Sequence, residues 1–154
     1  MVRKLVFPLE QVARRLSEQR PKDPPHAGYL LQKEHHTGPL PAHINQCYVN
    51  NHHRELHRTD CTIKCTDGDN CVEINKDVAL VRNFYTLDED KFVVFEKFKE
   101  VRNFFSYPLD STHLGISRVS QLSGVLESCP ITAIGRKCIM LPYKDQHIIL
   151  PLLH

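Results

Sequence analysis

The sequence lacks any apolar run close to the roughly 20 residues that a membrane-spanning helix needs. It also lacks a phosphate loop, a nucleophile elbow and a His-Glu-x-x-His zinc motif. The first ten residues are charged too early to form a signal peptide. We therefore expect an intracellular protein that does not enter a membrane, and these absences disfavour the common enzyme classes.

The six cysteines include no Cys-x2-Cys pair, the usual spacing in structural zinc sites. Without a secretory signal, we expect reduced thiols or metal ligands rather than disulfides. The candidate zinc ligands are His57, Cys61, Cys65 and Cys71. An extended strand would hold Cys61 and Cys65 about 13 Å apart, too far for one ion. No cofactor is therefore our main expectation, and zinc is the alternative.

The net charge of +2 is too small to indicate a nucleic-acid-binding surface. Seven of the ten histidines lie before residue 60, so acidification would make this part of the chain more positive. At 154 residues, the chain has the length of one ordinary domain. Its composition divides it into three parts: an N-terminal helix at 1–20, a flexible linker at 21–51 and a β-rich domain at 52–154.

The first part contains a helical pattern from Leu9 to Arg20, with an apolar stripe at Leu9, Val12, Ala13 and Leu16. A lone helix of about twelve residues is marginal in water, so its stripe should dock on the β-domain or on a partner. The linker holds five of the ten prolines and few large apolar residues. Such a composition favours a disordered arm.

The β-domain is predicted from extended segments separated by turn residues. One hairpin is expected to join 61–65 to 71–74 across Asp67-Gly68, and another to join 78–86 to 91–99. Later extended segments are 104–107, 115–119, 136–141 and 146–152. About seven strands at this spacing predict a small barrel or a strongly bent antiparallel sheet. The apolar last segment should pack into it, with Pro151 at an edge or a bulge.

Eight aromatic residues lie within 84–107, and most must be core. The segment Phe104-Phe105-Ser106-Tyr107 cannot hide every ring on one face of a strand. The candidate partner-binding residues are Tyr85, Phe105 and Tyr107. Rings of this kind can line a groove or form a cage for a methylated lysine.

The order of an extended segment at 76–81, a second at 92–98, an irregular connection and the run 130–140 resembles the bromo-adjacent homology (BAH) domain of chromatin proteins. The resemblance implies a β-rich barrel that engages histone or partner surfaces, in some members through an aromatic cage. The tryptophan often found in the strands of that family is absent here, so we carry over no cage residue.

The segments 105–109, 114–116, 138–143 and 149–154 also resemble the C-terminal region of uncharacterised animal proteins associated with transposable elements. That resemblance implies no established activity. It implies that residues 1 to about 60 are the remnant of a longer parent with a DNA-binding or catalytic part.

From these patterns we expect a protein-interaction module without catalysis, with a chromatin- or transposon-related role in the nucleus. Its partner would be a histone or another nuclear protein. The first alternative is a zinc-stabilised nucleic-acid-binding domain, and the second is a small enzyme of unknown class.

Overall fold

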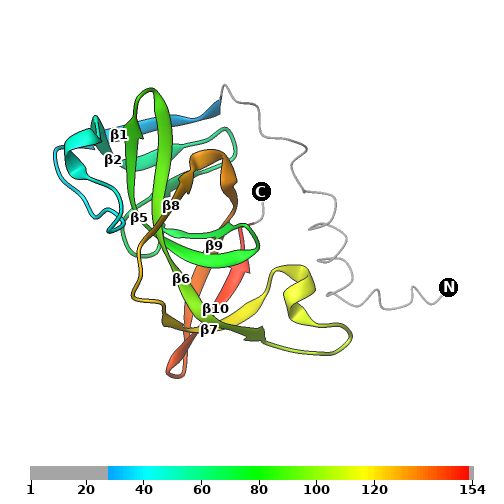
Figure 1. The fold of residues 1–154 in the computed structure, drawn as a ribbon. Helices are drawn as coiled ribbons and strands as arrows, with labels where there is room; N and C mark the ends of the chain where they lie inside the picture. The colour runs from blue at the N-terminus through cyan, green and yellow to red at the C-terminus, as the bar shows by residue number, and fades with distance from the viewer. Residues whose placement is uncertain (1–27, 153–154) are drawn as a thin grey trace.

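The computed structural model describes residues 28–152, and the regular structure in this part of the chain is mainly β (Figure 1). Its strands form one 10-stranded sheet in which every pairing is antiparallel. The strands are β1 (Leu30–His35), β2 (Asn51–His57), β3 (Thr62–Lys64), β4 (Cys71–Ile74), β5 (Asp77–Leu87), β6 (Asp90–Asn103), β7 (Ser117–Leu122), β8 (Glu127–Pro130), β9 (Ile134–Tyr143) and β10 (Gln146–Pro151). The connections include the short 3-10 helices η2 (Gln46–Tyr48), η3 (Ser111–Leu114) and η4 (Ile131–Ala133). The predicted mainly β, antiparallel fold is confirmed, with more strands than the seven expected.

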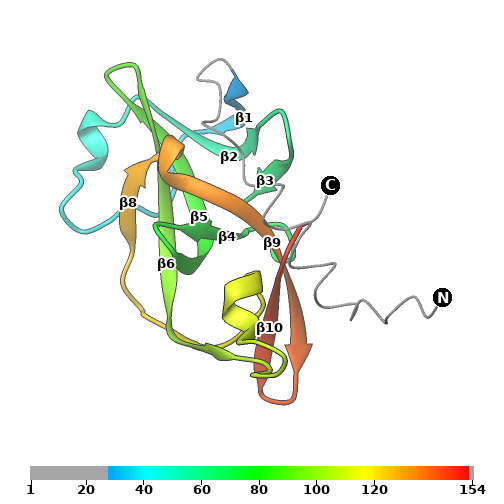
Figure 2. The same ribbon diagram turned by 90° about the vertical axis from the view of Figure 1, so that its right-hand side faces the viewer.

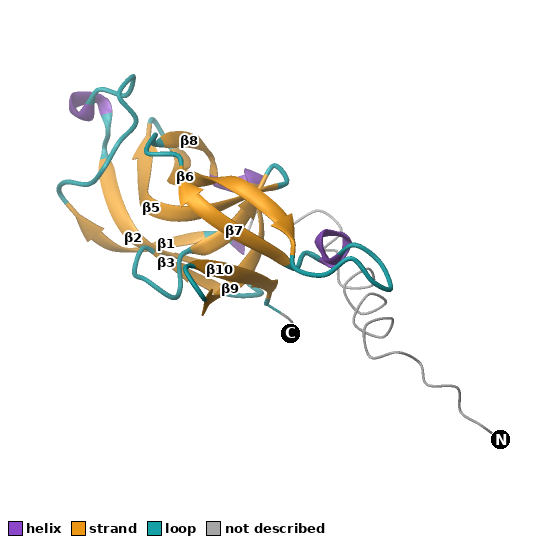
Figure 3. Ribbon diagram, turned by 90° about the horizontal axis from the view of Figure 1, so that it is seen from below, coloured by secondary structure: helices purple, strands orange, loops and turns teal. Residues whose placement is uncertain are grey.

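Six strands form a closed circuit of hydrogen-bonded pairs. Starting from β5, the pairing passes through β4, β9, β10, β7 and β6 and returns to β5. The other strands lie outside this circuit: β2 pairs with β5 and carries β1 and β3, while β8 pairs with β6. Figures 2 and 3 show the strands curling around one another. The circuit gives its six members partners on both sides, which removes free edges.

The hairpin of β5 and β6 is the longest element pair and confirms the second predicted hairpin. Its turn is shorter than expected, because Leu87 pairs with Asp90 and only Asp88 and Glu89 lie between them. Both turn residues have positive φ, as a two-residue turn that follows the strand twist requires. The register shifts between Val81 and Asn83, so β5 contains a bulge.

Strands β4 and β5 are buried on both faces and separate two hydrophobic cores. Successive residues of a strand point to opposite faces. Accordingly, Cys71 lies in one core while Val72 lies in the other. The first core comprises Tyr29, Leu56, Ile63, Val72, Ile74, Ala79, Val81, Phe84, Val93, Phe95, Ile131 and Ile134. The second core comprises Cys71, Val78, Leu80, Val119, Cys138 and Ile149, and all six come from strands of the closed circuit.

A third, smaller cluster forms where η3 meets the β9–β10 hairpin. Leu114 and Ile116 are buried there. Partly buried side chains pack against these two: Phe105, Leu109, Ile148 and Leu150. Phe105 and Leu109 belong to the segment between β6 and η3, whose residues 104–107 were predicted to be a strand. That prediction is wrong, because β6 already ends at Asn103.

The predicted hairpin of 61–65 with 71–74 is also wrong. Strand β3 pairs with β2, where Ile63 lies opposite Leu56 and both are buried in the first core. Strand β4 instead pairs with β5 and β9. Long-range pairing that buries both faces of β4 outweighs the local turn signal at Asp67-Gly68.

Strand β1 lies inside the predicted linker at 21–51, and it pairs with β2 along its length. Tyr29 is buried in the first core and Leu31 packs against that core. Among the described residues of this segment, few large apolar side chains are buried, which is why its composition resembles that of a linker. The predicted helix at 9–20 lies outside the described residues.

The last strand packs into the sheet as expected, but not at an edge. Strand β10 lies between β9 and β7. The pairing with β7 extends only from His147 to Ile149, so Pro151 lies beyond it and pairs with β9 alone. Its missing N–H group therefore interrupts no hydrogen bond to β7. Within residues 28–152, no helix has the length and apolar character needed to cross a bilayer.

Candidate functional site

The four candidate zinc ligands are divided between the two cores. Cys61 and Cys65 pack against the first core, whereas Cys71 belongs to the second. His57 lies on β2, and its Nε2 is 2.9 Å from Oε2 of Glu55. In the described part of the chain, no three His, Cys, Asp or Glu side chains form a group that could hold a metal ion. The structure therefore does not bring these four residues together.

The thiols around the first core are kept protonated by their surroundings. Burial raises the pKa of Cys65 to about 12 and that of Cys129 to about 11. In the second core, the pKa of Cys138 is raised, first by its hydrogen bond with Cys71 and then by burial. These side chains behave as small hydrophobic groups and are poor nucleophiles.

Tyr85 lies inside the fold and not on its surface. Its side chain is buried, and its ring stacks on Phe92 with the ring centres 5.2 Å apart. Its hydroxyl is 2.7 Å from the hydroxyl of Ser128 on β8. Tyr85 therefore joins β5, β6 and β8 inside the fold.

The other two aromatic candidates lie near η3 and differ in exposure. Phe105 is half-buried and packs against the third cluster. Tyr107 is 82% exposed, the most exposed of the large apolar side chains among the described residues. Of the three candidates, only Tyr107 presents a whole ring to solvent.

A larger apolar surface lies on the outer side of the β9–β10 hairpin. Residues directly opposite each other on antiparallel strands share a face. Leu141 lies opposite Ile148, and Ile139 lies opposite Leu150. Tyr143, two residues after Leu141, continues this side. We call this surface, together with Phe104, the hairpin face: Phe104, Ile139, Leu141, Tyr143, Ile148 and Leu150.

The hairpin face is only partly covered. The third cluster packs against Ile148 and Leu150, while Leu141 and Phe104 keep 45% and 40% of their surface exposed. The ring of Phe104 meets that of Tyr143 edge to face, with the centres 5.3 Å apart. This contact joins the segment after β6 to the end of β9 and fixes the two aromatic rings in one surface.

One border of the hairpin face is basic. The register across β6, β7 and β10 places Arg102 opposite Arg118, and Arg118 opposite Ile148. Nε of Arg118 is buried without a hydrogen-bond partner among residues 28–152, and Arg102 is 3.6 Å from Glu100. Like charges directly opposite each other repel. A negatively charged group near this pair would relieve that repulsion.

A buried polar cluster joins β1, β2 and β5 on another part of the molecule. Nδ1 of His52 is 2.8 Å from Nδ2 of Asn83, which also donates to the carbonyl of Pro39 at 3.1 Å. The ring of His35 lies 5.5 Å from that of His52. Burial, followed by the nearby His35 and His53, lowers the pKa of His52. The cluster is built around a neutral histidine.

Sequence reasoning missed most of the hairpin face. The alternation Ile139, Leu141, Tyr143 is visible in the sequence, as is the opposing pair Ile148 and Leu150. This alternation indicates one apolar face on each strand. The opposite face of each strand also carries an apolar residue, Cys138 on β9 and Ile149 on β10, and both belong to the second core. Nothing in the sequence tells which of two apolar faces remains in water.

The fold and this face define the class: an antiparallel β-domain that leaves an apolar, basic-bordered surface accessible. Residues 34–152 match the model of a family described as Domain of unknown function (DUF8592), and the chain belongs to this family. The matched part includes β2 to β10 and therefore the whole hairpin face. No curated protein and no solved structure matches the chain.

Proposed function

We propose that this protein is a non-catalytic protein-interaction module that binds its partner through the hairpin face. The observation that carries the proposal is the accessible apolar surface of Leu141 on the β9–β10 hairpin and of Phe104 in the segment after β6, whose ring contacts Tyr143. Contiguous apolar surface bordered by charge is typical of interaction sites, and aromatic anchors contribute much of the binding free energy at such sites.

The charge around the face indicates the chemistry of the partner. Arg102 and Arg118 lie in one cross-strand row with Ile148 and Leu141. Nζ of Lys144 lies 5.4 Å from the ring centre of Tyr143 at the other end. A complementary partner presents apolar side chains flanked by carboxylates. The resemblance to BAH domains supports a nuclear, chromatin-associated protein as this partner.

The protonated state of the cysteine thiols supports the proposal that the module is not catalytic. Burial raises the pKa of Cys65 to about 12 and that of Cys129 to about 11, so neither is ionised near neutral pH. We also infer that the six-strand circuit is a small barrel. Its interior is occupied by the second core, which leaves the outer surface for recognition.

The test compares variants of the full chain in a pull-down from nuclear extract with quantitative mass spectrometry. The double variant Phe104→Ser, Leu141→Ser removes the apolar centre of the face. We expect it to lose bound proteins by about tenfold or more, as for anchor residues at other interfaces. Tyr107→Ser tests separately whether the exposed ring after Phe105 takes part.

The matched control is Tyr48→Ser, Val125→Ser, which also removes two exposed apolar side chains. Tyr48 belongs to η2, and Figures 1 and 3 place η2 and η3 at opposite ends of the molecule. Thermal unfolding checks that both double variants remain folded. Equal retention of the same proteins by the two variants, or no retained protein at all, contradicts the proposal.

A further inference from the structure

A buried amide, that of Asn83, connects the loop between β1 and β2 to the middle of β5. Its Nδ2 donates to the carbonyl of Pro39 at 3.1 Å and lies 2.8 Å from Nδ1 of His52. Both side chains are almost fully buried, with Asn83 1% and His52 3% exposed. A carbonyl oxygen only accepts, so the group that faces Pro39 must be the NH2 group of the amide. Its second hydrogen is then available to His52.

This arrangement fixes the tautomer of the neutral His52 ring. A ring nitrogen that accepts a hydrogen bond carries no hydrogen, so Nδ1 is bare and Nε2 carries the hydrogen. Protonation of the ring adds a hydrogen at Nδ1 and turns this nitrogen into a donor. Two donors then face each other across 2.8 Å, and the bond between Asn83 and His52 is lost.

The amide of Asn83 holds an acceptor in reserve for the charged ring. Its Oδ1 is buried and has no hydrogen-bond partner among residues 28–152. A half-turn of the amide directs this oxygen at the new N–H group of His52 and directs the NH2 group away from Pro39. The bond to the carbonyl of Pro39 is thereby exchanged for a charge-assisted bond to His52, which is the stronger kind.

The loop at 36–50 has few other attachments along its first part. Pro41 is the only buried residue within it. In the described part of the chain, the bond from Asn83 is the only hydrogen bond that joins 38–48 to another element. Segments with so few buried contacts open at a low cost in free energy.

The end of the loop is held separately. The N–H group of Asn50 donates to the carbonyl of Thr86 at 2.9 Å, and its Oδ1 accepts from the N–H group of Asp88 at 2.9 Å. Neither bond involves Asn83 or His52. Loss of the Asn83 bond therefore frees the first part of the loop and leaves its end in place.

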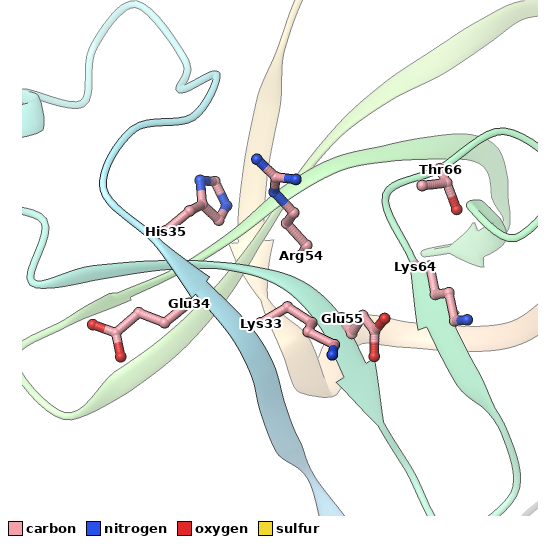
Figure 4. A pocket seen from close by; sticks show the side chains of 7 residues that line it. All are labelled: Lys33, Glu34, His35, Arg54, Glu55, Lys64 and Thr66. Atoms are coloured by element: carbon pink, nitrogen blue, oxygen red, sulfur yellow. The ribbon is translucent and has the colours of Figure 1, made fainter.

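The charged groups around His52 oppose its protonation. The register pairs His35 with His52 and Glu34 with His53, and Figure 4 shows His35 and Glu34 on opposite sides of β1. Glu34 therefore lies on the side of His53, while the ring of His35 lies 5.5 Å from that of His52. On β5, the residue opposite His52 is Tyr85, whose hydroxyl is already bonded to a serine. Burial, then His35 and His53, lowers the pKa of His52, so the ring gains its proton below the ordinary 6.5.

We propose that protonation of His52 releases residues 36–44 from β5, because the Asn83 amide turns over and gives up its bond to Pro39. The fold thus contains a pH-sensitive device in which one buried histidine controls the attachment of a surface loop. This loop carries η2, which lies at the opposite end of the molecule from η3 (Figures 1 and 3). The device is independent of the proposed hairpin-face interaction.

The test is a pH titration of the ¹⁵N-labelled full chain by NMR, from about pH 7.5 to about pH 4.5. Spectra of the histidine rings report the tautomer and the protonation of His52, and at the upper pH we expect hydrogen on Nε2 alone. As the ring gains its proton, backbone amides of 36–44 should shift with the same midpoint and lose heteronuclear NOE intensity. The amide of Asn50 should keep its NOE intensity.

Three variants of the full chain sharpen the test. His52→Gln removes the titrating group, so its loop amides should no longer follow pH. The control His43→Gln replaces an exposed histidine within the same loop and should keep the pH-dependent shifts. Gly38→Ala places a Cβ 2.5 Å from Nδ2 of Asn83, which displaces the loop. Its loop amides at the upper pH should already resemble those of the unmodified chain at the lower pH.

Several results would overturn the proposal: hydrogen on Nδ1 of His52 at the upper pH, a ring that does not titrate or that titrates without a change in the loop, or loop amides of His52→Gln that still follow pH. If His52→Gln does not fold, Gly38→Ala decides, because an unchanged loop spectrum in that variant also contradicts the proposal. Loss of the hairpin-face partners in the pull-down has no bearing on these results.

Discussion

At the scale of single residues, the buried polar cluster shows how the fold constrains ionisation. His52 is 3% exposed, and its pKa is lowered mainly by burial. The pKa of His53 is also lowered, again with burial as the largest cause. A charged imidazole at either position would lose hydration that the protein does not replace. Both side chains are therefore expected to be neutral in the folded protein at pH 7.

This state makes the stability of the protein sensitive to acid. Because both folded-state pKa values lie below the ordinary 6.5, the unfolded chain binds more protons as the pH falls. The free energy of unfolding therefore keeps its full value above about pH 6.5, where both histidines are neutral in the folded and the unfolded chain. It decreases as the pH falls toward the folded-state pKa values. We expect the free energy of unfolding, measured with urea, to be lower at pH 5.5 than at pH 7.5.

The variant His52→Gln should show a smaller loss between the two pH values, because it removes one of the two titrating groups. Its stability at pH 7.5 also falls if the bond with Asn83 is lost, so the readout is the difference between the two pH values. His113→Gln replaces an exposed histidine on η3 and should retain the full loss. An unchanged loss in His52→Gln would disprove the role assigned to this residue.

At the scale of elements, β5 illustrates what a pattern predicts and what it leaves open. Its run of apolar residues indicates a buried strand, and the hairpin with β6 is confirmed. The bulge near Arg82 has no signature in the sequence, because it depends on the register with β6. It places Leu80 in the second core and Phe84 in the first, although they are four residues apart. A regular strand would direct both to the same face.

This two-sided burial predicts that truncation is costly in either core. Phe84→Ala should lower the free energy of unfolding by about 3–5 kcal/mol, and Leu80→Ala by about 2–5 kcal/mol, because each leaves a cavity. Leu30→Ala, at an exposed position of β1, should change it by less than about 0.5 kcal/mol. Urea unfolding measures all three. If one of the two core variants were as mild as Leu30→Ala, the assignment of two separate cores would be wrong.

The strands that were not predicted from the sequence are short ones. Strands β1 and β8 are short and contain no fully buried residue, so neither carries a strong alternating pattern. Their strand structure is set by pairing with strands that are distant in the sequence. Strand β1 pairs with β2, which follows after a long loop, and β8 pairs with β6, from which β7 separates it. Strand β3 has only three residues and takes its partner from β2. Short strands depend on their neighbours more than on their own composition.

At the scale of the whole molecule, the closed circuit should determine which parts open together. Each of its six strands is hydrogen bonded on both sides, whereas β1, β3 and β8 each have one partner strand among the described residues. Arg58 ties the end of β2 to the circuit, donating from Nη1 to the carbonyls of Ile134 and Gly135 at 3.1 and 2.8 Å. We therefore expect the circuit to open as one cooperative unit.

Amide hydrogen exchange should reflect this organisation. Amides of β4, β5 and β9 are expected to exchange slowest, because they open only with global unfolding. Amides of β1 and β8 should exchange about tenfold faster or more, through local opening that costs at least about 1.4 kcal/mol less. Exchange measured by NMR on the full chain distinguishes these groups. Equal protection of β1 and β5 would show that the sheet opens as one unit.

The sequence by itself determined the class of fold and the most local hairpin. The apolar runs at 78–81 and 92–95, joined by an acidic turn, fix β5 and β6, because a hairpin needs only neighbouring residues and a short turn. The sequence also shows a cluster of aromatic residues within 84–107, and in the structure Tyr107 of this cluster is exposed to solvent.

Only the tertiary structure decided which partner each strand takes and which faces remain open. Leu141 and Ile149 are equally apolar in the sequence, yet one is exposed and the other lies in the second core. Arg54 and Lys33 become neighbours through the register of β1 with β2. Strand pairing and burial depend on contacts between residues that are far apart in the chain. A local sequence pattern gives no information about the free energy of these contacts.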